Sequence, residues 1–160
     1  MLQESVHFKE VLHPVSVTPR DIHQQVLVLQ GKTLIAVPKV QNVTPVSLEI
    51  TSCRDEALEK NKGEPIYLGI EGHKLSLCCV ESEGQPILKL EVRDSMNLYK
   101  SPNKEKPFVF YRKATGHTST FESAAYPGWF LCTSAEMGKP VSITKDIEKY
   151  NIAFYLNFKD

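Results

Sequence analysis

The sequence predicts an all-β fold built from about twelve short strands. Apolar and polar residues alternate with period two in segments such as 46–51, which is the pattern of a half-buried strand. Turn-forming residues recur about every 8–12 residues, a spacing typical of β-sandwiches and β-barrels. Helical periodicity is almost absent. A single core enclosed by many short strands is therefore expected.

Taken in order, the predicted strands end at residues that favour turns. Gly31 follows the first strand, Pro38 the second and Gly72 the fourth. Residues 56–64 are charged and are predicted to form a loop, and 95–99 form either a helical turn or a short strand. The strands fall into three sets of about 40 residues, 26–70, 75–112 and 118–158, which suggests a threefold repeat. The individual strands are expected at 26–29, 33–37, 46–51, 66–70, 74–80, 87–92, 108–112, 118–123, 129–134, 141–144 and 152–158.

The first residues differ from the rest of the chain. Residues 1–20 contain Pro14 and Pro19 and alternate weakly, so we expect a flexible, processed arm before a single domain at 21–160. Residues 1–15 lack the apolar segment of a signal peptide, and no segment approaches the roughly 18 apolar residues of a membrane span. We therefore expect cytoplasmic synthesis without a signal peptide and no membrane insertion.

The composition favours binding over catalysis. Lysine plus arginine and aspartate plus glutamate both number 19, so the chain lacks the basic excess of a nucleic-acid-binding protein. The sequence contains no recognisable catalytic, nucleotide-binding or metal-binding motif, so we expect no enzyme activity, cofactor or metal. His73 near Cys78 and Cys79 is a partial ligand set, but a loop histidine beside a strand is the more common arrangement. Alternation predicts that Glu91 and Glu122 face solvent.

The cysteines are expected to be free thiols. A chain made in the cytosol rarely forms disulfides, and buried cysteine behaves as a small apolar residue. Cys78 and Cys79 are adjacent in a predicted strand, so their side chains should point to opposite faces. The other two cysteines are Cys53 and Cys132.

One long motif near the C-terminus resembles the interleukin-1 family signature. The pattern F-x-S-x-x-x-P-x-x-F-L-C-T at 121–133 is followed by an aliphatic position, and we interpret its residues as structural. Segments 28–31, 34–38, 65–70 and 107–112 resemble the interleukin-36 branch, and the likeness covers about residues 20–160. It implies a β-trefoil, a six-stranded barrel capped by three hairpins. The signature residues are Phe121, Ser123, Pro127, Phe130, Leu131, Cys132, Thr133 and Val141.

The resemblance also implies a function. Such a protein is a monomeric pro-inflammatory cytokine that leaves the cell by a non-classical route. It binds the ectodomains of the interleukin-36 receptor and the interleukin-1 receptor accessory protein, which activates NF-κB and MAP-kinase signalling. Residues 124–132 also resemble the receptor antagonist of this branch, which binds without recruiting the accessory protein. A carbohydrate-binding trefoil is a more remote alternative, because it would need repeated aromatic motifs and the chain has one tryptophan.

The family resemblance places the functional residues in three segments. Interleukin-36 ligands are trimmed about nine residues before an aliphatic-x-Asp motif; Pro19, Arg20 and Asp21 align with it, so the mature start is expected near Glu10. Proline replaces the aliphatic residue here. Related ligands diverge in the loops 70–75 and 144–152, and an exposed tyrosine is a plausible binding anchor. The expected receptor-binding residues are Glu71, His73, Lys145, Asp146, Glu148, Lys149 and Tyr150.

Overall fold

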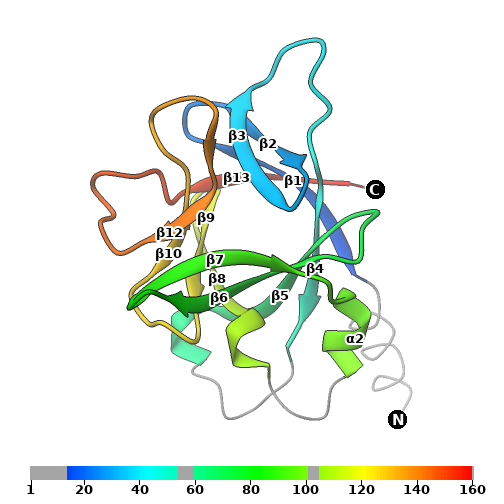
Figure 1. Ribbon diagram of the computed structural model, residues 1–160, viewed down its shortest axis with the longest axis vertical. Coiled ribbons are helices and arrows are strands. Elements are labelled where there is room, and N and C mark those ends of the chain that lie inside the picture. The colour runs from blue at the N-terminus through cyan, green and yellow to red at the C-terminus, as the bar shows by residue number, and fades with distance from the viewer. Residues whose placement is uncertain (1–13, 54–59, 101–104, 160) are drawn as a thin grey trace.

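The computed structural model describes residues 14–53, 60–100 and 105–159 (Figure 1). Strands dominate these residues, with one short α-helix, α2 (Ser95–Lys100), and two 3-10 turns, η1 (Lys60–Lys62) and η2 (Lys106–Phe108). The strands are β1 (Val15–Asp21), β2 (Gln25–Gln30), β3 (Thr33–Pro38), β4 (Leu48–Ser52), β5 (Glu64–Ile70), β6 (Ser76–Ser82), β7 (Gln85–Glu91), β8 (Val109–Thr115), β9 (Thr118–Ser123), β10 (Phe130–Cys132), β11 (Lys139–Pro140), β12 (Ser142–Thr144) and β13 (Phe154–Phe158).

Six strands close into a barrel. β1 pairs with β4, β4 with β5, β5 with β8, β8 with β9, β9 with β13, and β13 returns to β1. The hairpins β2–β3 and β6–β7 and the pair β10–β12 lie outside this ring. Each follows a barrel strand, so three similar units, 15–52, 64–115 and 118–158, make up the molecule. This arrangement confirms the predicted β-trefoil of a six-stranded barrel capped by three hairpins.

The apolar residues that alternate along the strands meet inside the barrel. Phe110, Phe121 and Phe154 are at most 1% exposed and belong to the main core cluster, and the rings of Phe121 and Phe154 lie 6.1 Å apart. Cys79 belongs to this cluster, whereas Cys78 belongs to a second cluster on the other face of β6. The opposite orientation of the adjacent cysteines is therefore confirmed.

Residues 15–20 differ from the expected flexible arm, because they form most of β1. Val17 and Asp21 are fully buried, and β1 pairs with β13 over five residue positions. Proline is normally excluded from a paired strand because it lacks an N–H group. Pro19 is accommodated because it lies between the β4 ladder, which ends at Val17, and the β2 ladder at Arg20. The barrel therefore begins at Val15 instead of residue 21, and residues 1–13 lie outside the described residues.

Residues 95–99, for which the sequence left two possibilities, are helical. The Asp94 carboxylate accepts a hydrogen bond from the Met96 N–H, and the Asp94 carbonyl accepts one from the Leu98 N–H. Leu98 and Tyr99 are buried on the inner side of the helix. The first two predicted sets of strands were also displaced, because the first repeat starts with β1 and not with β2, whereas the third set has the predicted bounds 118–158.

The buried carboxylate of Asp21 joins the first and third repeats. It accepts hydrogen bonds from the backbone N–H groups of His23 and Gln25 at 2.9 and 2.8 Å, and from the Gln25 amide at 2.7 Å. The Thr133 hydroxyl donates at 2.6 Å, and the Asn151 amide lies at 3.5 Å. Thr133 and Asn151 also form a backbone bridge with each other. We call these five residues the Asp21 cluster.

Replacing Asp21 is expected to destabilise the fold strongly. Asp21→Ala would leave buried donors of Gln25 and Thr133 unpaired, so we expect a loss of about 3 kcal/mol in the free energy of unfolding. Asp21→Asn keeps one acceptor oxygen and should lose less. Urea unfolding followed by tryptophan fluorescence measures both. Glu136→Ala, which removes an exposed carboxylate, is the control; an equal effect of Asp21→Ala and Glu136→Ala would contradict the role of the cluster.

Candidate functional site

The loop between β12 and β13 presents most of the predicted binding residues. Its backbone is fixed by a turn in which the Asp146 N–H donates to the Thr144 hydroxyl at 2.9 Å. The Lys149 N–H points back to both the carbonyl and the carboxylate of Asp146, each at 3.3 Å. Residues 145–149 are exposed, and Tyr150 is half-buried. Asp146 therefore shapes the loop while the side chains around it remain open to a partner.

Two lysines of this loop lie over aromatic rings. The Lys145 ammonium is 5.8 Å from the centre of the Trp129 ring, and that of Lys149 is 5.7 Å from the Tyr150 ring. Such cation–π contacts hold long side chains in place while leaving their charge exposed. Trp129 was assigned only a structural role from sequence. Its identity as the single tryptophan, a residue enriched in binding hot spots, was the available signal.

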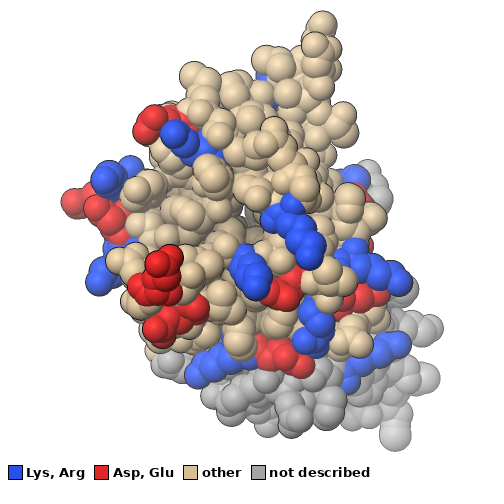
Figure 2. All heavy atoms as spheres, in the orientation of Figure 1, with Lys and Arg blue, Asp and Glu red and all other residues tan. Residues whose placement is uncertain are grey.

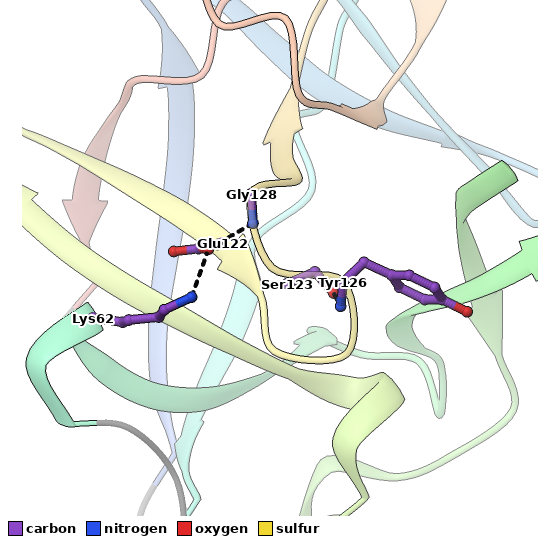
Figure 3. A network of polar contacts seen from close by, with 5 residues as sticks. All are labelled: Lys62, Glu122, Ser123, Tyr126 and Gly128. Atoms are coloured by element: carbon purple, nitrogen blue, oxygen red, sulfur yellow. Dashed lines mark hydrogen bonds and ion pairs between the residues drawn. The ribbon is translucent and has the colours of Figure 1, made fainter.

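The signature segment forms a tight loop from Ser123 to Gly128, directly before Trp129 in the sequence (Figure 3). The Glu122 carboxylate accepts the Gly128 N–H at 2.8 Å and pairs with the Lys62 ammonium at 3.2 Å. The Ser123 hydroxyl accepts the Tyr126 N–H at 3.1 Å. Glu122 thus differs from its predicted solvent-facing role, because only 14% of its side chain is exposed.

The other signature residues are mostly buried. Phe121, Ser123, Leu131, Cys132 and Thr133 are at most 1% exposed, whereas Phe130 is half-buried and Pro127 is exposed in the turn. Val141 lies in the main core.

The loop between β5 and β6 is tied to both ends of the described chain. The Glu71 carboxylate pairs with the Lys159 ammonium at 2.8 Å and accepts the Ser16 hydroxyl at 2.9 Å. The hydrogen bond from Lys159, followed by that from Ser16, lowers the pKa of Glu71. The Lys159 N–H also donates to the Ser16 carbonyl at 2.9 Å. His73 is exposed in this loop.

The structure does not bring the two predicted binding loops together. In Figure 1 the 145–150 segment projects at the left, whereas the loop after β5 lies at the right, near the C-terminal end. Glu71 and His73 therefore belong to one surface, and Lys145, Asp146, Glu148, Lys149 and Tyr150 belong to another. A partner that contacts one loop leaves the other available.

The proposed processing motif is part of the barrel. Pro19 and Asp21 point inward, and the Arg20 guanidinium lies 5.1 Å from the centre of the Tyr155 ring and donates to the Gln24 side chain. The aspartate of the motif therefore has a structural role in the Asp21 cluster. Glu10, the expected mature start, lies outside the described residues.

A family model described as "Interleukin-1 / 18" matches residues 40–156, which is most of the chain. The chain belongs to the interleukin-1 family. It is 47% identical to human interleukin-36 alpha over 133 residues, covering 82% of this chain and 84% of the relative. Mouse interleukin-36 beta is 43% identical over 152 residues, covering 91% of this chain and 83% of the relative.

Two further comparisons bear on the interleukin-1 family fold and function. The solution structure of "the pro-inflammatory cytokine interleukin-36alpha" superposes with a TM-score of 0.79 at 42% identity, covering 94% of this chain and 96% of that structure. The mouse interleukin-36 receptor antagonist protein is 41% identical over 126 residues, covering 79% of this chain and 80% of the relative. The protein is therefore a secreted cytokine of this family and not an enzyme, and its relatives include an antagonist.

The cysteines of this interleukin-1 family member are free and buried. Burial raises the pKa of Cys78 to about 11 and that of Cys79 to about 12, and burial also raises the pKa of Cys132. These thiols therefore stay protonated at neutral pH and are poor nucleophiles.

In residues 14–53, 60–100 and 105–159, no group of three histidine, cysteine or acidic side chains is arranged to hold a metal. Helices in the same ranges are all too short or too polar to cross a membrane.

Removing the Glu122 carboxylate should loosen the signature loop. Glu122→Ala leaves the Gly128 N–H and the Lys62 ammonium without this acceptor, so we expect faster hydrogen exchange at Gly128 and a loss of about 1 kcal/mol in stability. Amide exchange measured by NMR tests this. Glu81→Ala, an exposed strand glutamate, is the control. Unchanged exchange at Gly128 in Glu122→Ala would show that the loop does not depend on this contact.

The Glu71–Lys159 ion pair should make stability depend on pH. The folded pKa of Glu71 is lower than its ordinary value of 4.5, so the carboxylate stabilises the fold above that value. This contribution is lost as pH falls through the lowered pKa and glutamate becomes protonated. Urea unfolding of the parent chain and Glu71→Gln should therefore differ at pH 7 and converge toward pH 3. Salt should reduce the difference at pH 7, and a gap that persists at pH 3 would argue against this pair as its source.

Proposed function

We propose that the chain is an interleukin-36-type agonist. It binds the ectodomain of the interleukin-36 receptor, recruits the interleukin-1 receptor accessory protein and activates NF-κB and MAP-kinase signalling. The observation that carries this proposal is the extended similarity to interleukin-36 alpha and beta together with the same trefoil fold. Release from the cell by a non-classical route and activity as a monomer are parts of the same proposal.

The placement of the two loops supports a mechanism with two receptors. The Glu71 surface and the Lys145–Tyr150 surface lie on different sides of a closed barrel (Figure 1). One rigid ligand can therefore contact two receptor chains without their competing for the same residues. The turn at Asp146 and the lysine–aromatic contacts fix the second surface before binding, which reduces the entropy lost on association.

Processing near Glu10 fits the position of β1. The barrel begins at Val15, so a chain that starts at Glu10 retains every strand. Ser16, the second residue of β1, contacts Glu71. β1 therefore begins beside the proposed Glu71 surface, which supports a role for trimming in receptor access.

An antagonist is the alternative function. The similarity to the mouse interleukin-36 receptor antagonist is close to that of the two agonist-type relatives, so identity alone does not separate them. An antagonist would use one of the two surfaces and leave the other without a partner. Agonist activity is favoured because the match to mouse interleukin-36 beta covers 91% of this chain, whereas the match to the mouse antagonist covers 79%.

A reporter assay tests the proposal. Cells carrying the interleukin-36 receptor and the accessory protein receive the full chain or chains that start at Glu10, Val11 or Leu12. We expect NF-κB output from at least one trimmed form, and no output from cells without the accessory protein. Silence with competition against a known agonist would identify an antagonist, and silence without competition would show that the receptor assignment is wrong.

Charge reversal tests the loop surface in the same assay. The double variant Lys145→Glu and Lys149→Glu should raise the concentration needed for half-maximal output by about tenfold, because it reverses charge at the proposed interface. Lys113→Glu, on an exposed position of β8, is the matched control. An equal effect of the control would remove the support for this loop as a receptor contact.

A further inference from the structure

A surface depression lies where the three hairpin units converge. Its volume is about 450 Å³, within the range of small-molecule sites. One wall is the start of β3, another is β7, and the third is Pro140 with Val141. Figure 2 shows this face hollowed near its centre, with basic and acidic side chains side by side along one rim.

The depression opens between the two edges of the sheet. In the main strand order, β11 is the first strand and β7 is the last, so the sheet's two ends face each other across the hollow. β11 is held against β3 by the pairs Lys139↔Ala36 and Pro140↔Ile35. The ladders of the described residues contain no pairing between β7 and either β3 or β11.

The floor of the depression is apolar and continuous with the barrel core. Leu34, Leu90 and Val141 line it and belong to the main core cluster, and Leu88 packs against that cluster while remaining half-exposed. Such a floor favours contact with a hydrocarbon or aromatic group, because apolar surface is then removed from water.

The rim carries one positive charge that lacks a close partner. The Lys89 ammonium and the Glu91 carboxylate form an ion pair at 2.8 Å, so their charges compensate. Lys32 faces the same rim, and its electrostatic effect on Glu91 is weaker than that of Lys89. No ion pair to Lys32 is found within the part of the chain that the structure describes. The three charges sum to one positive charge beside an apolar floor.

We propose that this depression binds a small amphipathic anion, such as a free medium-chain carboxylate. The apolar chain would lie on Leu34, Leu88 and Val141, and the carboxylate would approach the Lys32 ammonium. Charge complementarity selects an anion over a neutral amphiphile, and the limited volume selects a free small molecule over a protein segment. The site uses none of the residues of the two proposed receptor surfaces. The anion-binding proposal can therefore be tested independently of the receptor assignment.

The test is an NMR titration of the full chain with sodium decanoate below its micelle concentration. We expect saturable shifts confined to the amides of residues 32–34, 88–91 and 141. Lys32→Ala should weaken decanoate binding by about fivefold, and Lys113→Ala should leave it unchanged. Decanol, which lacks the charge, should bind the parent chain more weakly than decanoate and should be insensitive to Lys32→Ala.

Three outcomes would overturn the proposal. One is the absence of saturable shifts, or shifts spread over the whole surface. Another is an equal loss of decanoate binding in Lys32→Ala and Lys113→Ala. The third is binding to phosphatidylserine vesicles that depends on Lys32 without any binding of free decanoate, which would assign the rim to a lipid surface. The amide spectrum of each variant, which must match the parent outside the mutated position, checks that it is folded.

Discussion

The Asp21 carboxylate is the constraint on which the arrangement of the barrel depends. An ionised carboxylate without solvent contact is stable only when hydrogen bonds replace its water, and five donors surround this one. Three of the donors belong to His23 and Gln25, close to Asp21 in the chain, and the other two belong to Thr133 and Asn151 of the last repeat. Only when β1 lies against β13 do Thr133 and Asn151 supply their hydrogen bonds to the buried Asp21 carboxylate. The cluster therefore favours the closed barrel over arrangements in which the first strand is detached.

The same cluster determines where the loop proposed as a receptor contact begins and ends. Thr133 and Asn151 exchange backbone hydrogen bonds of 2.9 Å in both directions, so the chain between them leaves and returns at one fixed position. Within it, the ladder Phe130↔Thr144 fixes the start of the exposed turn. Tyr150 lies directly beside the anchored Asn151. The exposed residues 145–149 are thus held between two anchored positions, which is how a small domain presents a defined surface from a loop.

Much of the fold could be predicted from the sequence, because the two faces of a barrel strand have different surroundings and this produces period-two alternation. Period-two alternation identified strands such as β6, where Leu77 and Cys79 face the main core. β1 was missed because two of its inward positions are Pro19 and Asp21, residue types that are depleted in strands. Their burial is explained by partners more than 100 residues away in sequence, and alternation contains no information on such pairs. Glu122 was misjudged for a similar reason, since its acceptor role depends on the Gly128 turn and on Lys62 from another repeat.

The candidate binding residues could likewise be predicted only in part from the sequence. The two loops were chosen because related ligands diverge there, but their separation to opposite sides follows from strand order, which local sequence does not encode. Trp129 illustrates the consequence. Its half-buried ring packs against the core, so a structural role was the natural interpretation, yet Lys145 lies on its outer face. Because Trp129 contacts both the core and Lys145, the position of its ring in the barrel affects the position of the loop. Changes to the core beneath Trp129 should therefore alter the loop surface even where no exposed residue is replaced, which links the stability of the trefoil directly to its recognition function.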